Sequence, residues 1–274
     1  MRKKISNRQI QAFQKTVHAH FIAYGRHDLP WRRRRNAYSV LVSEVMLQQT
    51  QADRVRLKYE EFMSEFPTIH QLADASLKEV LGAWQGLGYN RRAKFLHESA
   101  RLIVTQWAGK VPRDPTSLAS LPGIGKATAS AICAFAFNMP SVFIETNIRS
   151  VFIHHFFKGS ALVDDKEIVC LVERALDRGR PRIWYSALMD YGSSLKKRTA
   201  NPSRRSKHHV RHDAFVGSSR EARGQVLAAL IAEPRSLRGL YRFLSLPAPR
   251  IKKATQELQR EGMVAKQNQV FVIP

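Results

Sequence analysis

The sequence predicts a mainly α-helical protein that ends in a small winged-helix-like module with a short β-hairpin. Apolar residues recur at spacings of three and four along most of the chain, and strand-like alternation is rare before the last dozen residues. The chain has 274 residues, of which 44% are hydrophobic, so it can bury an ordinary core. No run approaches the ~18 apolar residues of a membrane span, and no apolar segment follows the basic N-terminus. We therefore expect a protein without membrane association, located in the cytoplasm.

Residues 1–195 are expected to form one helical domain. Short polar or Gly- and Pro-containing segments separate its amphipathic stretches. Its helices are predicted at 8–24, 39–63, 68–74, 77–84, 91–107, 115–121, 126–137, 147–157, 164–176 and 183–195.

A change in composition follows this domain. Residues 196–212 hold seven Lys or Arg, three His and no acidic residue, so residues 196–214 are predicted to be a basic linker, either solvated or in contact with DNA phosphates. Helical periodicity resumes at 219–232, 237–244 and 248–261, and two short apolar runs flank a polar turn before Pro274. Three helices and a hairpin predict a winged-helix-like module over 215–274, a type of module that binds DNA in some proteins and docks proteins in others.

The balance of charge indicates a polyanionic partner. Lys and Arg number 45 against 22 Asp and Glu, a formal net charge of +23. Neutralising phosphates with such side chains releases condensed counterions, which favours nucleic-acid binding. The two cysteines, Cys133 and Cys170, lie in apolar surroundings and are too few for a four-cysteine cluster or a zinc site.

The segment Leu121-Pro-Gly-Ile-Gly-Lys126 lies between two predicted helices. Gly123 and Gly125 allow a tight turn whose N–H groups are not shielded by side chains, and the next helix adds its N-terminal N–H groups. Such a hairpin grips a phosphate without reading the base sequence. An ordinary helical hairpin without a ligand is the alternative.

Two further segments carry candidate catalytic carboxyls. Glu44 shares a predicted helical face with apolar residues, which would raise its pKa and suit a general acid; an exposed or capping glutamate is the alternative. Gln48 and Gln49, one turn later, would form hydrogen bonds with base edges, or they belong to a solvated helix end. Glu145 precedes a natural helix start, where it would cap the helix or stabilise positive charge on a sugar. Glycosidic cleavage requires one proton-donating and one ionised carboxyl.

Together, these segments resemble the helix-hairpin-helix (HhH-GPD) DNA glycosylase superfamily, and most closely its MutY-like adenine glycosylase branch. The resemblance covers roughly residues 8–195. It rests on five motifs in the family's order: Tyr24-Gly-Arg-His-Asp-Leu-Pro-Trp31, Ser43-Glu-Val-Met-Leu-Gln-Gln-Thr-Gln51, Trp84-Gln-Gly-Leu-Gly-Tyr89, Leu121-Pro-Gly-Ile-Gly125 and Met189-Asp-Tyr-Gly192.

The resemblance implies a two-subdomain glycosylase fold and a role for each matching residue. A six-helix barrel subdomain is expected at about 30–140, and a second helical subdomain from 1–29 with 141–195. Glu44 falls at the acid that protonates adenine N7. Glu145 falls where the superfamily carries an Asp that stabilises the oxocarbenium ion. Tyr89 falls at a wedging tyrosine, and Gln48 and Gln49 at glutamines around the extruded base.

Four departures from the family pattern limit what carries over. Glu145 is one methylene longer than the usual Asp. Ala127 stands where the endonuclease III branch has a Schiff-base lysine, so a monofunctional enzyme without a lyase step is expected. The four cluster-cysteine positions carry Lys196, Ser203, Ser206 and His212, so no iron–sulfur cluster is expected. The C-terminal module also takes the place of the nudix-like domain of typical MutY proteins, so recognition of 8-oxoguanine does not follow.

The sequence therefore predicts a monofunctional DNA glycosylase of base excision repair, acting as a monomer on double-stranded DNA, associated with the nucleoid. A mispaired adenine is the leading substrate. The alternatives are a G:T or G:U mispair, a deaminated or alkylated purine, or a non-catalytic binder of damaged DNA. No cofactor is expected, apart from a monovalent cation that the hairpin could hold. The residues expected to contact DNA are Gln48, Gln49, Tyr89, Gly123, Gly125, Lys126, Lys196, Lys197, Arg198, Arg204 and Arg205.

Overall fold

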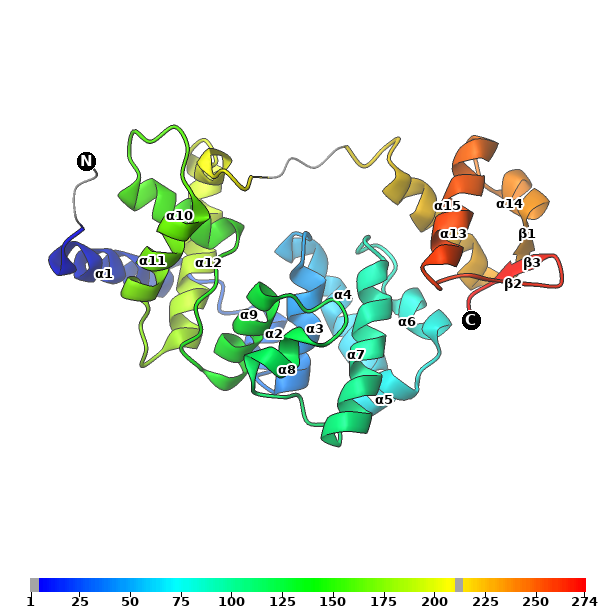
Figure 1. Ribbon diagram of the computed structural model, residues 1–274, viewed down its shortest axis with the longest axis horizontal. Coiled ribbons are helices and arrows are strands. Elements are labelled where there is room, and N and C mark those ends of the chain that lie inside the picture. The colour runs from blue at the N-terminus through cyan, green and yellow to red at the C-terminus, as the bar shows by residue number, and fades with distance from the viewer. Residues whose placement is uncertain (1–4, 210–213) are drawn as a thin grey trace. The chain divides into compact units, whose positions relative to one another are not determined.

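The computed structural model describes residues 5–209 and 214–274 and is mainly α-helical, as predicted (Figure 1). The chain forms two compact units. Unit 1 comprises Met1–Leu41, Arg113–Ser120 and Ile124–Arg211, and unit 2 comprises Val42–Pro112, Leu121–Gly123 and His212–Pro274. The helix α3 (Ala37–Leu47) begins in unit 1 and ends in unit 2. Within the described residues, no helix is long and apolar enough to cross a membrane.

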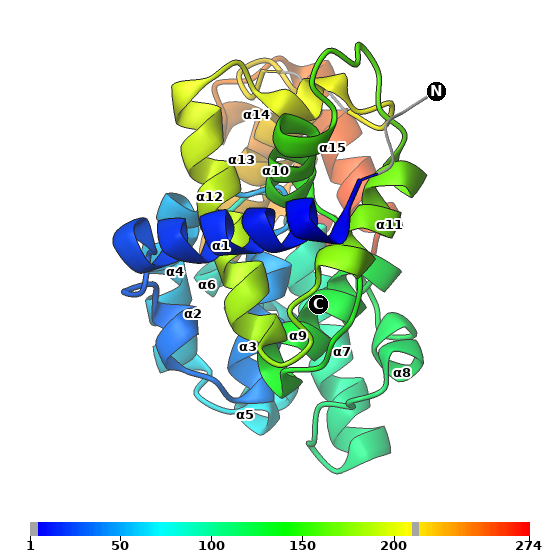
Figure 2. The ribbon, with the colours of Figure 1, turned by 90° about the vertical axis from the view of Figure 1, so that its left-hand side faces the viewer.

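Unit 1 is built around a core of aromatic and branched side chains. The ring of Phe13 meets those of Phe152 and Trp184 edge-on, at centroid distances of 5.1 and 5.8 Å. Figure 2 shows α1 lying across α11 and α12, which it contacts. The elements of this unit besides α3 are α1 (Asn7–Tyr24), α2 (Pro30–Arg33), α8 (Pro115–Ala119), α9 (Lys126–Phe137), α10 (Thr146–Phe156), α11 (Asp165–Ala175), α12 (Pro181–Arg198) and the 3-10 helix η1 (Pro202–Arg205).

A buried acid ties the N-terminal segment of unit 1 to α12. The carboxylate of Asp190, within the last of the family motifs, forms ion pairs of 2.7 Å with both Arg26 and Arg32. Hydrogen bonds and the charges of these two arginines hold the pKa of Asp190 below its usual value, although burial opposes them. Close packing continues at Gly192, where an added Cβ would lie 2.3 Å from the backbone oxygen of Asn147. Helix α12 therefore fixes the start of α10, which carries Glu145.

Unit 2 combines the remaining helices of the expected glycosylase domain with the C-terminal module. The predicted winged helix is confirmed: three helices are combined with an antiparallel sheet of order β1-β3-β2, whose strand β1 lies between the first two helices. In this sheet Phe271 lies opposite Arg235 on one side and Lys266 on the other. The short strand β1 was not predicted. The elements are α4 (Ala52–Glu65), α5 (Ile69–Asp74), α6 (Leu77–Ala83), α7 (Arg91–Trp107), α13 (Ser219–Ala232), β1 (Arg235–Ser236), α14 (Leu237–Phe243), α15 (Ala248–Arg260), β2 (Ala265–Gln267) and β3 (Val270–Val272).

Besides β1 and the short helix α2, which were not predicted, the structure differs from the sequence predictions in three places. The single helix predicted at 39–63 is interrupted between α3 and α4, where Gln49 adopts a positive φ of 55°. Part of the predicted linker 196–214 is ordered, because α12 continues to Arg198 and η1 follows. The units also divide the chain differently from the predicted subdomains: α8 and α9 belong to unit 1, and the winged-helix module belongs with α4–α7 in unit 2.

Candidate active site

The predicted hairpin joins α8 to α9, and its two glycines play different parts. Gly123 has a φ of +74°, and an added Cβ would lie 2.9 Å from Phe95, so only glycine fits both the turn and the contact. Gly125 caps α9 without a side-chain hydrogen bond, and an added Cβ there would meet no atom within 4 Å. Both glycines and Lys126 are exposed. The start of α9 is therefore open to an anion.

In unit 2, four of the predicted DNA-contacting residues line one cavity of ≈ 440 Å³: Gln48, Gln49, Tyr89 and Gly123. The side-chain amide of Gln48 donates a hydrogen bond of 3.3 Å to the carbonyl of Gly123, which links the end of α3 to the hairpin turn. Tyr89 has a φ of +48°, which is uncommon for an aromatic residue, and is half-buried. These four residues, which lie up to 75 positions apart in the sequence, thus form one polar surface that includes the aromatic ring of Tyr89.

A buried arginine that sequence reasoning missed holds this surface together. Arg92 is 9% exposed, and one of its Nη atoms donates to the carbonyls of Val45, Met46 and Gln48 at 2.6–2.8 Å. The other Nη donates to the Thr50 hydroxyl at 2.9 Å and to the Gly88 carbonyl at 3.1 Å. Arg92 therefore caps the C-terminus of α3 and fixes the Gln49 turn and the turn before Tyr89. Burial lowers the pKa of Arg92 to about 10, so it remains a cation at neutral pH.

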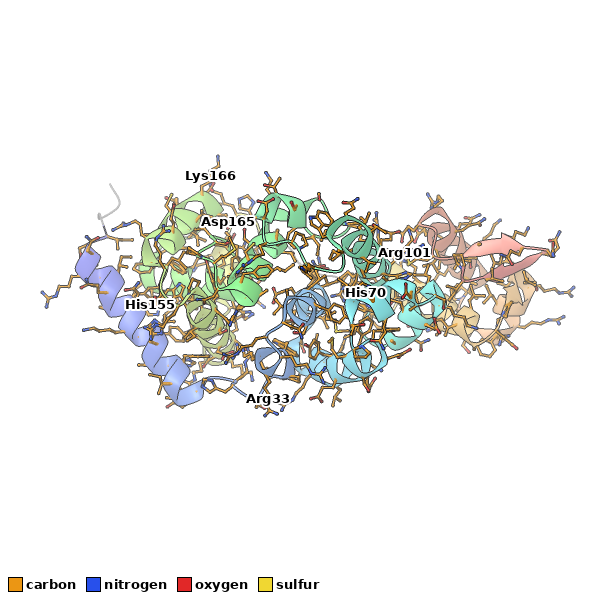
Figure 3. The ribbon with its side chains drawn as sticks, turned by 90° about the horizontal axis from the view of Figure 1, so that it is seen from below. Arg33, His70, Arg101, His155, Asp165 and Lys166 are labelled. Atoms are coloured by element: carbon orange, nitrogen blue, oxygen red, sulfur yellow. The ribbon has the colours of Figure 1, made fainter. Side chains whose placement is uncertain are left out.

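Replacing Arg92 with methionine is expected to destabilise the protein by about 3 kcal/mol, because several buried carbonyls would lose their donor. Urea denaturation measures the loss. The matched control is Arg101→Met, because Arg101 is an exposed arginine on the same helix (Figure 3). Equal stability of the two variants would show that Arg92 does not support the turns.

Glu44 is half-buried on α3, between the buried residues Ser43 and Val45. It lies four positions before Gln48, which follows the end of α3 and lines the cavity. The raised pKa of Glu44 stays a prediction. Glu44 belongs to unit 2 and Glu145 to unit 1.

Glu145 is the N-cap of α10, as one of the two sequence interpretations had it. Its Oε1 accepts hydrogen bonds from the backbone N–H groups of Asn147 and Ile148, at 2.7 and 3.0 Å, and the Asn147 side-chain amide lies 3.3 Å from its Oε2. The Oδ1 of Asn147 is buried without a protein hydrogen-bond partner. Burial raises the pKa of Glu145 above its usual value, while the two N–H groups and the charge of Lys196 oppose the rise.

Lys196 lies beside this carboxylate in unit 1. It is half-buried near the end of α12, and burial lowers its pKa while the charge of Glu145 opposes that change. The sequence prediction had grouped Lys196 with the DNA-contacting residues. The positive charge of the partly buried Lys196 favours the ionised form of the Glu145 carboxyl. The sequence held no signal for this pairing, because the two residues are far apart in the chain.

The other basic residues separate into exposed and engaged side chains. Lys126, Lys197, Arg198 and Arg204 are exposed. Arg205 instead donates hydrogen bonds to the carbonyls of Phe157, Ser160 and Ile153 at 3.0–3.3 Å, so its guanidinium supports the loop after α10. A DNA contact by Arg205 stays a prediction.

The positions corresponding to cluster cysteines form hydrogen bonds instead. Ser203 and Ser206 are buried, and their hydroxyls donate to Asn201 Oδ1 and Asp165 Oδ1, both at 2.9 Å. Asp165, labelled in Figure 3, is also held by Arg149 at 2.7 Å. His212 lies outside the described residues. Neither serine supplies a thiolate, so the residues present do not fit an iron–sulfur cluster. Among the described residues, no group of three His, Cys, Asp or Glu side chains gathers to hold a metal ion.

Comparison with known proteins matches residues 42–176 to the model of the HhH-GPD superfamily base excision DNA repair proteins. This region of the chain is an HhH-GPD domain. The chain is 46% identical over 176 residues, 63% of its length, to a protein of Mycolicibacterium smegmatis named adenine DNA glycosylase, and 35% identical over 188 residues, 67% of its length, to one of Buchnera aphidicola. It spans 59% and 52% of the length of these relatives.

The solved structure of a thermostable thymine-DNA glycosylase is similar to this chain, with a TM-score of 0.62 and 28% identity, covering 68% of this chain and 87% of the other. The similarity confirms the fold that the five motifs predicted. The matched region of the family model includes Glu44, Tyr89, the hairpin and Glu145.

Proposed function

We propose that this HhH-GPD protein is a DNA glycosylase of base excision repair that removes a mispaired adenine from double-stranded DNA. The supporting observation is the position of Glu44 on α3, just before the cavity lined by Gln48, Gln49 and Tyr89, within an HhH-GPD domain. The relatives that share 35–46% identity with this chain are named adenine DNA glycosylase. We expect the protein to act as a monomer on chromosomal DNA in the nucleoid.

DNA binding would rest on the hairpin and on the charge of the chain. The N–H groups at the start of α9 suit a phosphate, since Gly125 brings no side chain between them and the ligand. A monovalent cation at the hairpin carbonyls is compatible with this role. The net charge of +23 adds attraction that does not depend on base sequence.

The chemistry would divide between the two carboxyls. A base rotated out of the duplex costs a few kcal/mol, and an inserted side chain such as Tyr89 helps to offset that cost. Glu44 would protonate the purine and make it a better leaving group. Glu145 would stabilise the oxocarbenium-like sugar, and the unpartnered Oδ1 of Asn147 could accept a hydrogen bond from the attacking water. The product would be an abasic site.

Hydrolysis without strand cleavage is expected. The exposed first turn of α9 carries Ala127 where a lyase would need an amine, and Lys126 precedes it by one residue and so projects in another direction. A strand break that forms without alkali and can be trapped with borohydride would contradict this expectation.

Labelled duplexes that each carry one defect test the proposed substrate: A:8-oxoguanine, A:G, A:C, G:T, G:U and hypoxanthine. After incubation, alkali cleaves the strand wherever a base has been removed. We expect cleavage at adenine. Cleavage of only the G:T duplex would favour the second candidate, a thymine glycosylase, which the structural similarity to such an enzyme motivates. Binding without cleavage of any duplex would contradict the enzyme assignment.

A further inference from the structure

The winged-helix module contacts the candidate wedge residue directly. Nη1 of Arg220, in the first turn of α13, donates a hydrogen bond of 2.7 Å to the Tyr89 hydroxyl. The Arg220 guanidinium carbon also lies 5.3 Å from the centroid of the Tyr89 ring, within the range of a cation–π contact. Both residues belong to unit 2, and Ser219, Arg220 and Arg223 line the same cavity as Gln48 and Gln49.

The Tyr89 ring is held from two elements. The guanidinium carbon of Arg92, on α7, lies 5.5 Å from the ring centroid, and Arg92 binds the carbonyl of the preceding Gly88. Tyr89 thus has a positive φ and an aromatic ring within cation–π distance of two arginines. Arg92 donates its hydrogen bonds to backbone carbonyls and a threonine hydroxyl, whereas Arg220 donates to the phenol oxygen at the far end of the Tyr89 side chain.

The helix that carries Arg220 is itself anchored. Arg223, one turn later, pairs with Glu261 at 2.6 Å and with Glu257 at 3.5 Å, which fastens α13 to α15. Helix α13 also packs on α6, where Ile231 lies 4.0 Å from the position of a Cβ added at Gly82. The winged-helix module is therefore packed in a defined position beside Tyr89 within unit 2.

We propose that the winged-helix module forms part of the DNA-recognition surface. Within it, Arg220 is a positioning residue that orients the Tyr89 side chain for insertion into the duplex. The proposal rests on the proposed function, since Tyr89 takes its wedge role there. A module that only covers Tyr89 would instead inhibit the enzyme. The cavity beside the contact and the partial exposure of Tyr89 favour positioning, because they leave room for a nucleotide next to the ring.

Arg220→Met tests the proposal in the full chain, with Arg242→Met as the matched control, since Arg242 is an exposed arginine of the same module on α14. Loss of one hydrogen bond and one cation–π contact should weaken binding to an A:G duplex by roughly tenfold and reduce the preference over a matched duplex. Arg242→Met should retain both the affinity for the A:G duplex and the preference over matched DNA. If Arg242 contacts a phosphate, its loss should weaken binding to both duplexes by the same small factor. Arg220→Lys, which keeps the charge, should recover part of the preference.

A double-mutant cycle separates positioning from a structural role. If Arg220 acts through the phenol hydroxyl, Arg220→Met should reduce the binding preference much less in a Tyr89→Phe background than in the wild type. The remaining loss should correspond only to the cation–π contact. The melting temperature should be the same in all of these variants. Additive losses would overturn the proposal, and so would wild-type preference in Arg220→Met. Higher activity of Arg220→Met would identify an inhibitory cover instead. Binding is measured separately from excision, so a wild-type protein that excises nothing refutes the proposed function, while the binding preference still decides the role of Arg220.

Discussion

Replacing Glu44 with glutamine is expected to lower the single-turnover rate of base excision by at least about a hundredfold, since a general acid contributes roughly 10²–10⁴-fold. Glutamine keeps the size and the hydrogen-bonding capacity of the side chain on α3 but cannot transfer a proton to the leaving base. Binding to the mispaired duplex should change little, because the carboxyl is half-buried and Gln48, Gln49 and the hairpin remain. Excision with enzyme in excess over labelled DNA measures the rate.

The matched control for this substitution is Glu60→Gln. Glu60 is an exposed glutamate on α4, in the same unit. Its removal changes the net charge by the same amount and should leave the rate unaltered. If Glu44→Gln excises as fast as Glu60→Gln, then Glu44 is not the proton donor.

Glu145→Gln is expected to slow excision by about 10²–10³-fold, because the developing positive charge on the sugar would lose its carboxylate. The substitution should be tolerated structurally, since the amide oxygen of glutamine can still accept the N–H groups of Asn147 and Ile148. An unchanged single-turnover rate would exclude the assigned role.

The pH profile offers a second test of Glu145. The carboxylate form is the active one, and burial raises the pKa of Glu145, so activity should fall with decreasing pH earlier than it would for an ordinary glutamate. Lys196→Gln removes a nearby cation that favours the carboxylate, which should raise the pKa further and move the acid limb to higher pH. Lys197→Gln, at the exposed next position, should leave the midpoint of that limb in place. A limb that does not move in Lys196→Gln would show that the two charges do not interact.

Local signals in the sequence account for the parts of the site that were predicted. Gly123 and Gly125 form the hairpin because a left-handed turn and an open helix N-terminus are properties of those positions themselves. Glu145 precedes a residue run that starts a helix, and the structure has it as the cap. The spacing of apolar residues predicted most helices and the terminal hairpin, because this spacing is also a property of each segment by itself.

Contacts between distant segments account for what the sequence did not predict. The break after α3 depends on Arg92, more than 40 positions later, which resembles any charged residue at the start of a helix. Ser203 and Ser206 belong to a segment that looks solvated by composition, but both are buried, and Ser206 donates to the distant Asp165, which pairs with Arg149. The contact of the winged-helix module with Tyr89 likewise joins residues 131 positions apart, since Arg220 donates to the Tyr89 hydroxyl.

Release of the free base is the most direct test of the proposed activity. Wild-type protein is incubated with a duplex that carries one A:G or A:8-oxoguanine mispair, and the small-molecule fraction is separated and identified by mass. The proposal predicts free adenine in an amount equal to the alkali-sensitive sites, with none released by Glu44→Gln over the same time. Intact duplex with no free base, from protein that binds the mispair, would contradict it.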